Sequence, residues 1–187
     1  APGLPARDPK GDTDDDVARV TAALSKVADR LDARALEADP SAIGVLMATA
    51  MMARDPGLTS SVRTHLEEGD GPAHALWGAI DDFCAQLTAA GGYLAERVTD
   101  LHNVRDRALA VLQGLPEPGV PAFDSPVILV AEDLAPADTA TLDPELVRGL
   151  VTAAGGPTSH TAILAAQIGI PAVVRCPGIR EVESGTE

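Results

Sequence analysis

A segment near the end of the chain limits most strictly what this protein can fold into. Residues 155–174 read GGPTSHTAILAAQIGIPAVV, in which a Gly-Gly-Pro turn and two hydroxyl residues precede a histidine. Serine and threonine are preferred helix caps, so we expect a helix to begin at Thr158 or Ser159. The run IPAVV after that helix predicts a strand. A glycine loop, a helix and a strand in this order indicate a small α/β unit.

The first turn of the predicted helix is suited to an anion. Its backbone N–H groups have no acceptor within the helix, and Gly155 and Gly156 leave room for a phosphate beside them. The hydroxyls of Thr158 and Ser159 can cap the helix or bind phosphate oxygens. The helix end disfavours a protonated ring, so His160 is expected to be neutral and able to act as a nucleophile. The alternative is an ordinary histidine, because glycine turns and hydroxyl caps precede many helices.

The residues just before this segment have the composition of strands. VILVAEDL, from residue 127, is a short β-branched run, and GLVTAA, from residue 149, is a second strand candidate. Asp143-Pro144 predicts a small helix between them. We therefore assign residues 115–187 to an α/β domain.

Residues 13–114 have the pattern of a helical bundle. Aspartates at 12 and 14–16 predict the start of a long helix, and glycine and proline turns near residues 56, 69, 71, 91 and 114 predict where later helices begin or end. Apolar residues recur at spacings of three and four between these turns. The first long helix, for example, has Val17, Val20, Leu24, Val27 and Leu31 on one face. Short connections favour an all-α bundle as its architecture.

Composition restricts the partners and the compartment. Twenty-eight acidic residues against 14 lysines and arginines give a net charge of −14, which argues against nucleic acid and favours a basic protein partner. Cys84 and Cys176 lie far apart, without the spacing of a disulfide framework or a zinc site, and are expected to pack as small apolar residues. No run of about 18 apolar residues occurs. We expect a cytoplasmic protein with no membrane partner, and the abrupt end at Glu187 suggests a piece of a longer chain.

The motif around His160 closely resembles the phosphohistidine signature of phosphoenolpyruvate-utilising enzymes, which is carried by GGPTSHTAILA followed by GIPAVV. The blocks AMMARDPGL, YLAERVTDLHNVRDRAL and VILVAEDLAPADTATLDPELVRGLVTAAGG resemble the amino-terminal half of enzyme I, the phosphoenolpyruvate-protein phosphotransferase of the bacterial sugar phosphotransferase system. The dikinases that share the signature lack such a helical insertion. The resemblance implies an α/β phosphohistidine domain, a swivelling β/α/β unit, with an inserted all-α helical-bundle subdomain. Residues 1–12 are then expected to join the α/β domain, and residues 13–114 to form the subdomain that binds HPr.

The same resemblance implies the chemistry. His160 corresponds to the histidine that takes a phosphoryl group from phosphoenolpyruvate and passes it to a histidine of the phosphocarrier protein HPr. Thr139 corresponds to the threonine beside the active ring and is assigned to orienting the imidazole or a phosphoryl oxygen. No cofactor is expected in this fragment, because the phosphoenolpyruvate site and its Mg²⁺ belong to a carboxy-terminal barrel outside this chain. Dimerisation resides largely in that barrel, so we expect the fragment to be monomeric.

The resemblance also suggests partner-binding residues. Arg97 corresponds to an arginine of the HPr docking surface, although a solvated helix arginine near Glu96 and Asp100 is an equally good interpretation. Met51, like Met52, and Leu58 fall where the family has apolar docking or core residues, and core is the safer interpretation for each of them. His65, His74 and His102 follow neither a glycine turn nor a hydroxyl pair, so they are expected to be surface or packed residues.

Several residues depart from the family pattern. Ala165-Ala166 replaces a common Ala-Arg pair, so a basic group near the site is expected to be missing. Arg175 replaces a glycine after the final strand. Met47 and Thr49 stand where many relatives have Glu and then His or Gln, so the partner preference can differ. Two alternatives to enzyme I therefore stay open. One is an enzyme I-like module of a fused phosphocarrier, such as the phosphoryl-donor subunit of the dihydroxyacetone kinase system, and the other is a catalytically silent docking module.

Overall fold

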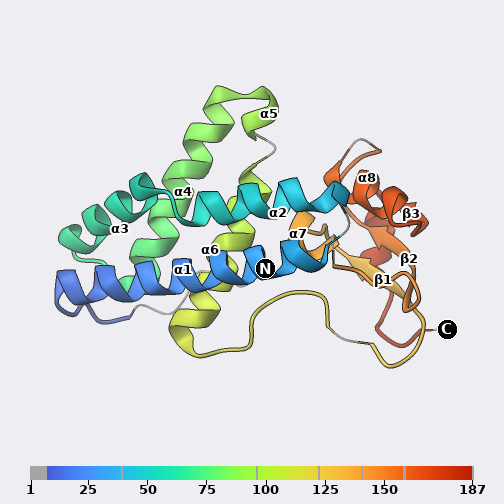
Figure 1. Ribbon diagram of the computed structural model, residues 1–187, viewed down its shortest axis with the longest axis horizontal. Coiled ribbons are helices and arrows are strands. Elements are labelled where there is room, and N and C mark those ends of the chain that lie inside the picture. The colour runs from blue at the N-terminus through green and yellow to red at the C-terminus, as the bar shows by residue number, and fades with distance from the viewer. Residues whose placement is uncertain are drawn as a thin grey trace. The chain divides into compact units, whose positions relative to one another are not determined.

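The chain folds into a helical unit and an α/β unit (Figure 1). The computed structural model describes residues 8–38, 40–95, 97–121, 123–139, 141–157 and 159–186. The first unit comprises the described part of Ala1–Ala33 together with Met47–Pro118, and the second comprises Arg34–Leu46 and Gly119–Glu187. The predicted fold class, an α/β domain with an inserted all-α subdomain, is confirmed.

The helices begin and end at the residues that the sequence indicated. Asp55 caps α3 by accepting a hydrogen bond from the N–H of Gly57 (2.7 Å), and Gly69 ends that helix at φ +111°. The last predicted helix, which follows Gly91-Gly92, is divided into a short part that ends at Ala95 and a longer part that begins at Val98, with Arg97 just before it making no side-chain capping bond. None of the helices in the described part of the chain is long and apolar enough to cross a membrane. The helices are α1 (Thr13–Glu37), α2 (Pro40–Ala53), α3 (Pro56–Glu68), α4 (Pro72–Ala90), α5 (Gly92–Ala95) and α6 (Val98–Gln113).

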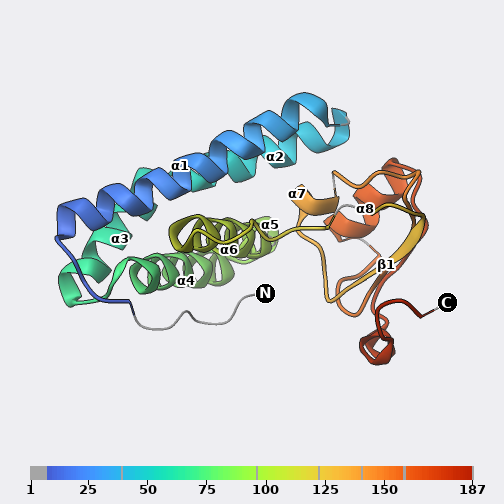
Figure 2. The same ribbon diagram turned by 90° about the horizontal axis from the view of Figure 1, so that it is seen from below.

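The apolar faces of these helices form the core of the first unit. Helix α4 packs against both α3 and α6, and Figure 2 shows α4 and α6 side by side. The predicted face of α1 is buried, as are residues of α3, α4 and α6 at helical spacing. Burial of this face supplies most of the stability of such a helix, because helix propensity alone is weak. Fully buried members include Val20, Leu24, Val27, Leu58, Leu66, Leu76, Ile80 and Val104.

A cluster of charges attaches the segment after α6 to the bundle. The carboxylate of Glu117 accepts a hydrogen bond from Arg30 of α1 (2.8 Å) and another from Arg107 of α6. Arg107 is fully buried, and its Nε also donates to Asn103 (2.8 Å). A buried guanidinium is tolerated only when such partners compensate for its lost hydration.

A three-stranded parallel sheet of order β1-β2-β3 forms the centre of the α/β unit. The strands are β1 (Val127–Ala131), β2 (Val147–Thr152) and β3 (Ala172–Val173), and the helices are α7 (Pro136–Thr139), α8 (His160–Gln167) and the 3-10 helix η1 (Pro177–Glu181). Helix α8 packs against β3 and α7 against α8. The core contains Val147 and Leu150 of β2, Ala165 of α8, and Leu142 and Ile170 from the loops.

The predicted domain boundaries differ from this division in three places. Residues 8–12 lie in the helical unit rather than the α/β domain, because Asp8 accepts a hydrogen bond from the N–H of Ala73 (2.8 Å) and lies 3.4 Å from His74. Residues 1–7 lie outside the described residues. Residues 34–46 belong to the second unit, and the boundary after α6 falls behind Pro118 rather than Gly114.

The predicted helix at Asp143-Pro144 is wrong, because the structure has a turn there. The carboxylate of Asp143 accepts from the N–H of Glu145 (2.8 Å), and its carbonyl accepts from Val147 (2.7 Å), where β2 begins. An aspartate that binds backbone in this way favours a turn over a helix.

We expect Glu117→Gln to lower the free energy of unfolding of the helical unit by about 3 kcal/mol, because the buried Arg107 loses a charged partner. Urea denaturation measures the change. The matched control is Glu145→Gln, whose carboxylate faces Arg148 at 3.9 Å with both side chains exposed and is expected to cost less than about 1 kcal/mol. Equal losses in the two variants would contradict the assigned role of Glu117.

Candidate functional site

His160 is the first residue of α8, at the position that the sequence indicated for the helix start. Ser159 caps the helix, and its side-chain oxygen accepts a hydrogen bond from the N–H of Ala162 (3.3 Å). The side chain of His160 is half-buried, and its ring has no hydrogen-bond partner among the described residues. The ring therefore stays free to meet a group from outside the chain.

The loop between β2 and α8 brings backbone close to the histidine. Gly155 has φ +83°, which favours glycine, and a Cβ at this position would lie 3.4 Å from the Ser159 hydroxyl oxygen. The N–H of Ser159 donates to the carbonyl of Gly156 (2.9 Å), so the loop folds back on itself just before the helix. Thr158, the other predicted phosphate-binding hydroxyl, lies outside the described residues.

A second hydroxyl, which sequence reasoning did not single out, fixes the first turn of α8. Thr161 is 2% exposed, and its hydroxyl lies 2.9 Å from the carbonyl oxygen of Leu134 and 3.1 Å from Oδ1 of Asp133. Asp133 Oδ1 also accepts from the N–H of Leu134 (2.9 Å). Thr161, the residue after His160, therefore joins the first turn of α8 to the loop between β1 and α7. The only signal in the sequence was its place next to His160.

Thr139 is buried at the end of α7, the helix that packs against α8. Its hydroxyl donates to the carbonyl of Ala135 (3.2 Å), one turn earlier in the chain. No hydrogen bond between Thr139 and His160 occurs in the described structure, so its assignment to orienting the ring stays a prediction.

The three predicted partner-binding residues lie in different environments. The side chain of Met51 on α2 is on the surface, with 72% of the residue exposed. Leu58 is fully buried in the helical core, which leaves it no surface for a partner. Arg97 is neither solvated nor free, because its guanidinium pairs with Asp100 at 3.0 Å and only 11% of its side chain is exposed. Of the three, Met51 is the residue available for contact.

The other histidines lie in the helical unit, each beside acidic groups or partly buried. His65 lies between Asp82 (2.9 Å) and Asp70 (3.5 Å), and His74 lies beside Asp8. Burial, with a smaller contribution from the charge of Arg105, lowers the pKa of His102. His65 and His102 lie beyond the first turns of α3 and α6. His74 lies in the first turn of α4 behind Gly69 and Gly71, but its ring is beside the carboxylate of Asp8, whereas the ring of His160 has no hydrogen-bond partner among the described residues.

The cysteines take no part in this arrangement. Cys84 is buried, and burial raises the pKa of its thiol to about 11, with a smaller contribution from Asp81. Cys176 is half-buried after β3. In the described part of the chain, no group of three or more His, Cys, Asp or Glu side chains is arranged to hold a metal ion.

Two stretches of the chain match known domains. Residues 3–97 match the N-terminal domain of PEP-utilising enzymes, and residues 123–187 match the mobile domain of PEP-utilising enzymes. The chain belongs to the PEP-utilising enzymes. The two matches fall largely on the helical unit and on the α/β unit.

The relatives of this chain identify the branch of the family. The phosphoenolpyruvate-protein phosphotransferase of Streptomyces coelicolor is 49% identical over 178 residues, which cover 95% of this chain and 32% of that protein. That of Haloferax volcanii is 40% identical over 134 residues, covering 71% of this chain and 24% of that protein. The solution structure of the Enzyme I protein nEIt has a TM-score of 0.74 and 28% identity, and the match covers 96% of this chain and 76% of that one. The predicted resemblance to the amino-terminal half of enzyme I is confirmed.

We expect Thr161→Val to lower the free energy of unfolding of the α/β unit by about 1–2 kcal/mol, because the carbonyl of Leu134 loses its buried donor. Amide hydrogen exchange in the first turn of α8 should rise with it. Thr186→Val is the control, since the Thr186 hydroxyl binds the carbonyl of Glu183 (2.7 Å) at an exposed position. Unchanged exchange at residues 160–163 in Thr161→Val would show that this hydroxyl does not fix the helix start.

Proposed function

We propose that His160 carries a phosphoryl group and exchanges it with the active histidine of the phosphocarrier protein HPr, in the cytoplasm and as part of the bacterial sugar phosphotransferase system. The observation that carries this proposal is the position of His160, an accessible ring in the first turn of α8 behind a glycine loop. Because the chain spans about a third of its Streptomyces relative, the supply of phosphate from phosphoenolpyruvate is assigned to the rest of a longer protein.

The step is a transfer between two nitrogens. An unprotonated ring nitrogen of His160 attacks the phosphorus, the N–P bond of phospho-HPr breaks, and its electron pair returns to the imidazole of HPr. One N–P bond is exchanged for another of the same kind, so the transfer can run in either direction. Positioning and stabilisation of charge on the phosphoryl oxygens supply most of the catalysis.

Backbone groups of the chain can provide the positioning and the charge stabilisation. The N–H groups of the first turn of α8 point toward the helix start, and the glycines of the loop place no side chain in the way of a phosphate. Thr161 holds this turn against the loop that follows β1, which keeps the donors preorganised. We assign no cofactor to this chain, and place the Mg²⁺ of the phosphoenolpyruvate step in the carboxy-terminal domain of the longer protein.

Helix α2 is the surface that we assign to HPr. Its sequence PSAIGVLMATAMMA has no charged residue in a chain of net charge −14, and Met47 and Met51 are 51% and 72% exposed. Exposed methionines one turn apart form an adaptable apolar contact, and acidic surroundings attract a basic partner and speed its approach. We expect a weak and rapidly exchanging complex with a monomeric fragment.

Incubation with ³²P-labelled phospho-HPr tests the transfer. The chain should acquire an acid-labile, base-stable label, His160→Ala should acquire none, and His102→Ala should be labelled like the parent. A label that persists in His160→Ala would assign the chemistry to another residue. Binding of phospho-HPr without any label would identify a silent docking module instead.

Truncation of Met51 tests the docking surface. Met51→Ala should weaken HPr binding about tenfold in an NMR titration, because a central apolar contact is lost. Leu115→Ala is the matched control, since Leu115 is also an exposed apolar residue of the helical unit. Leu58→Ala should lower stability by about 2–5 kcal/mol without a direct effect on affinity, as expected for a core residue. Equal affinities of the Met51 and Leu115 variants would move the docking site away from α2.

A further inference from the structure

Arg175, just after β3, has an unusual backbone conformation. Arg175 has a φ of +59°, and no other non-glycine residue in the described part of the chain has a positive φ. Its N–H donates to the carbonyl of Ala154 (3.2 Å), and the N–H of Cys176 donates to the carbonyl of Thr152 (2.9 Å). An L-residue in the left-handed region costs free energy that a glycine would avoid, so these two bonds hold the turn in a conformation that arginine itself does not favour.

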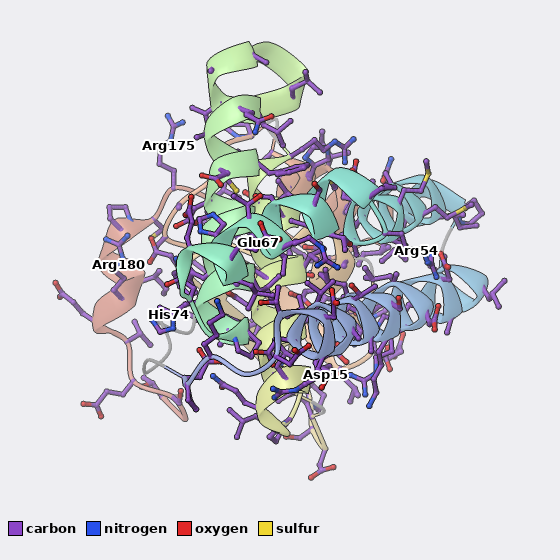
Figure 3. The ribbon with its side chains drawn as sticks, turned by 90° about the vertical axis from the view of Figure 1, so that its left-hand side faces the viewer. Asp15, Arg54, Glu67, His74, Arg175 and Arg180 are labelled. Carbon is purple, nitrogen blue, oxygen red and sulfur yellow. The ribbon has the colours of Figure 1, made fainter. Side chains whose placement is uncertain are left out.

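The side chain of Arg175 reaches the glycine loop before α8. Its Nε donates to the carbonyl of Gly155 (3.4 Å), and its Nη2 lies 3.5 Å from the position that a Cβ on Gly156 would occupy. The side chain is exposed, and Figure 3 shows it extending away from the ribbon. Arg180, in the same unit, is paired with Glu132, whereas Arg175 has no carboxylate partner within the described residues. Its charge is therefore available to an anion.

The loop itself needs such a charge if it is to hold a phosphoryl group. The segment from Ala153 to Gln167 contains no lysine or arginine, and Asp133 Oδ1 lies 3.7 Å from the position of a Cβ on Gly155. A phosphoryl group beside this loop would meet that carboxylate with only uncharged donors, backbone N–H groups and hydroxyls, to oppose it. The guanidinium of Arg175 can offset the repulsion, and its planar fork can donate to two phosphoryl oxygens at once.

We propose that Arg175 is a phosphate-binding residue, whose guanidinium lies over the Gly155–Gly156 loop and donates to oxygens of the phosphoryl group on His160. The inference rests on the proposed phosphorylation of His160. It replaces the expectation that the site lacks a basic group, because the arginine missing at Ala166 is compensated from the turn after β3. It also gives a reason for an arginine at a position whose backbone favours glycine.

The equilibrium between HPr and the chain measures this contact. Loss of a charged hydrogen bond to the phosphoryl group should shift the equilibrium constant for transfer from phospho-HPr about tenfold toward HPr in Arg175→Gln. Arg175→Lys keeps the charge but not the planar fork, so its equilibrium constant should lie between those of the parent and Arg175→Gln. Arg175→Gly should show the same loss as Arg175→Gln while its melting temperature is unchanged or higher, since glycine relieves the backbone strain. The control is Arg148→Gln, which removes the same charge from an exposed arginine of β2 and should leave the equilibrium unchanged.

The outcomes separate this inference from the proposed function. A labelled parent with a tenfold shift in the Arg175 variants and none in Arg148→Gln supports the contact. A labelled parent whose equilibrium is the same in Arg175→Gln overturns the role of Arg175 and leaves His160 as the carrier. Equal shifts in the Arg175 and Arg148 variants would assign the effect to net charge and also overturn the contact. A parent that acquires no label overturns the proposed function and the inference with it.

Discussion

The hydrogen bond from Thr161 to the carbonyl of Leu134 is the interaction on which the proposed site depends. It fixes the first turn of α8 against the loop after β1, and so decides where the N–H groups of that turn point. Ser159 caps the same turn, and Gly155 allows the chain to enter it through a left-handed conformation. His160 stands on a helix end that is held from both sides, which is what positioning of a phosphoryl group requires.

The polar groups around this turn have different tasks. Thr161, Ser159 and Asp133 bind backbone or one another and hold the loop in shape. The ring of His160 makes no hydrogen bond within the described residues, and the exposed Arg175 reaches the carbonyl of Gly155. A loop held in this way suits the proposed carrier role, because it keeps the start of α8 in place while His160 has no hydrogen-bond partner of its own. In the proposed function, the exposed and uncharged surface of α2 around Met47 and Met51 is assigned to recognition of HPr, separately from the chemistry.

Much of this arrangement could be predicted from the sequence because local signals determine it. Asp55-Pro56 and Gly69 define the ends of α3, and Ser159 behind Gly155-Gly156 defines the start of α8. Contacts between distant residues could not be predicted in this way. The bond between Thr161 and Asp133 joins residues 28 positions apart, and Asp8 reaches the start of α4 across 65 positions. Local chemistry also misled at Asp143, whose carboxylate stabilises a turn, and at Arg97, which pairs with Asp100 and is largely withdrawn from the surface.

The proposed function requires that the phosphoryl group becomes attached to the ring of His160. Heteronuclear NMR of the chain, with ¹⁵N-labelled imidazole rings and phospho-HPr as the donor, tests it directly through the coupling between phosphorus and ring nitrogen. A single ring should show this coupling, and it should be the ring of His160. Coupling to His65, His74 or His102, or phospho-HPr that loses its phosphate while all four rings stay unchanged, would contradict it.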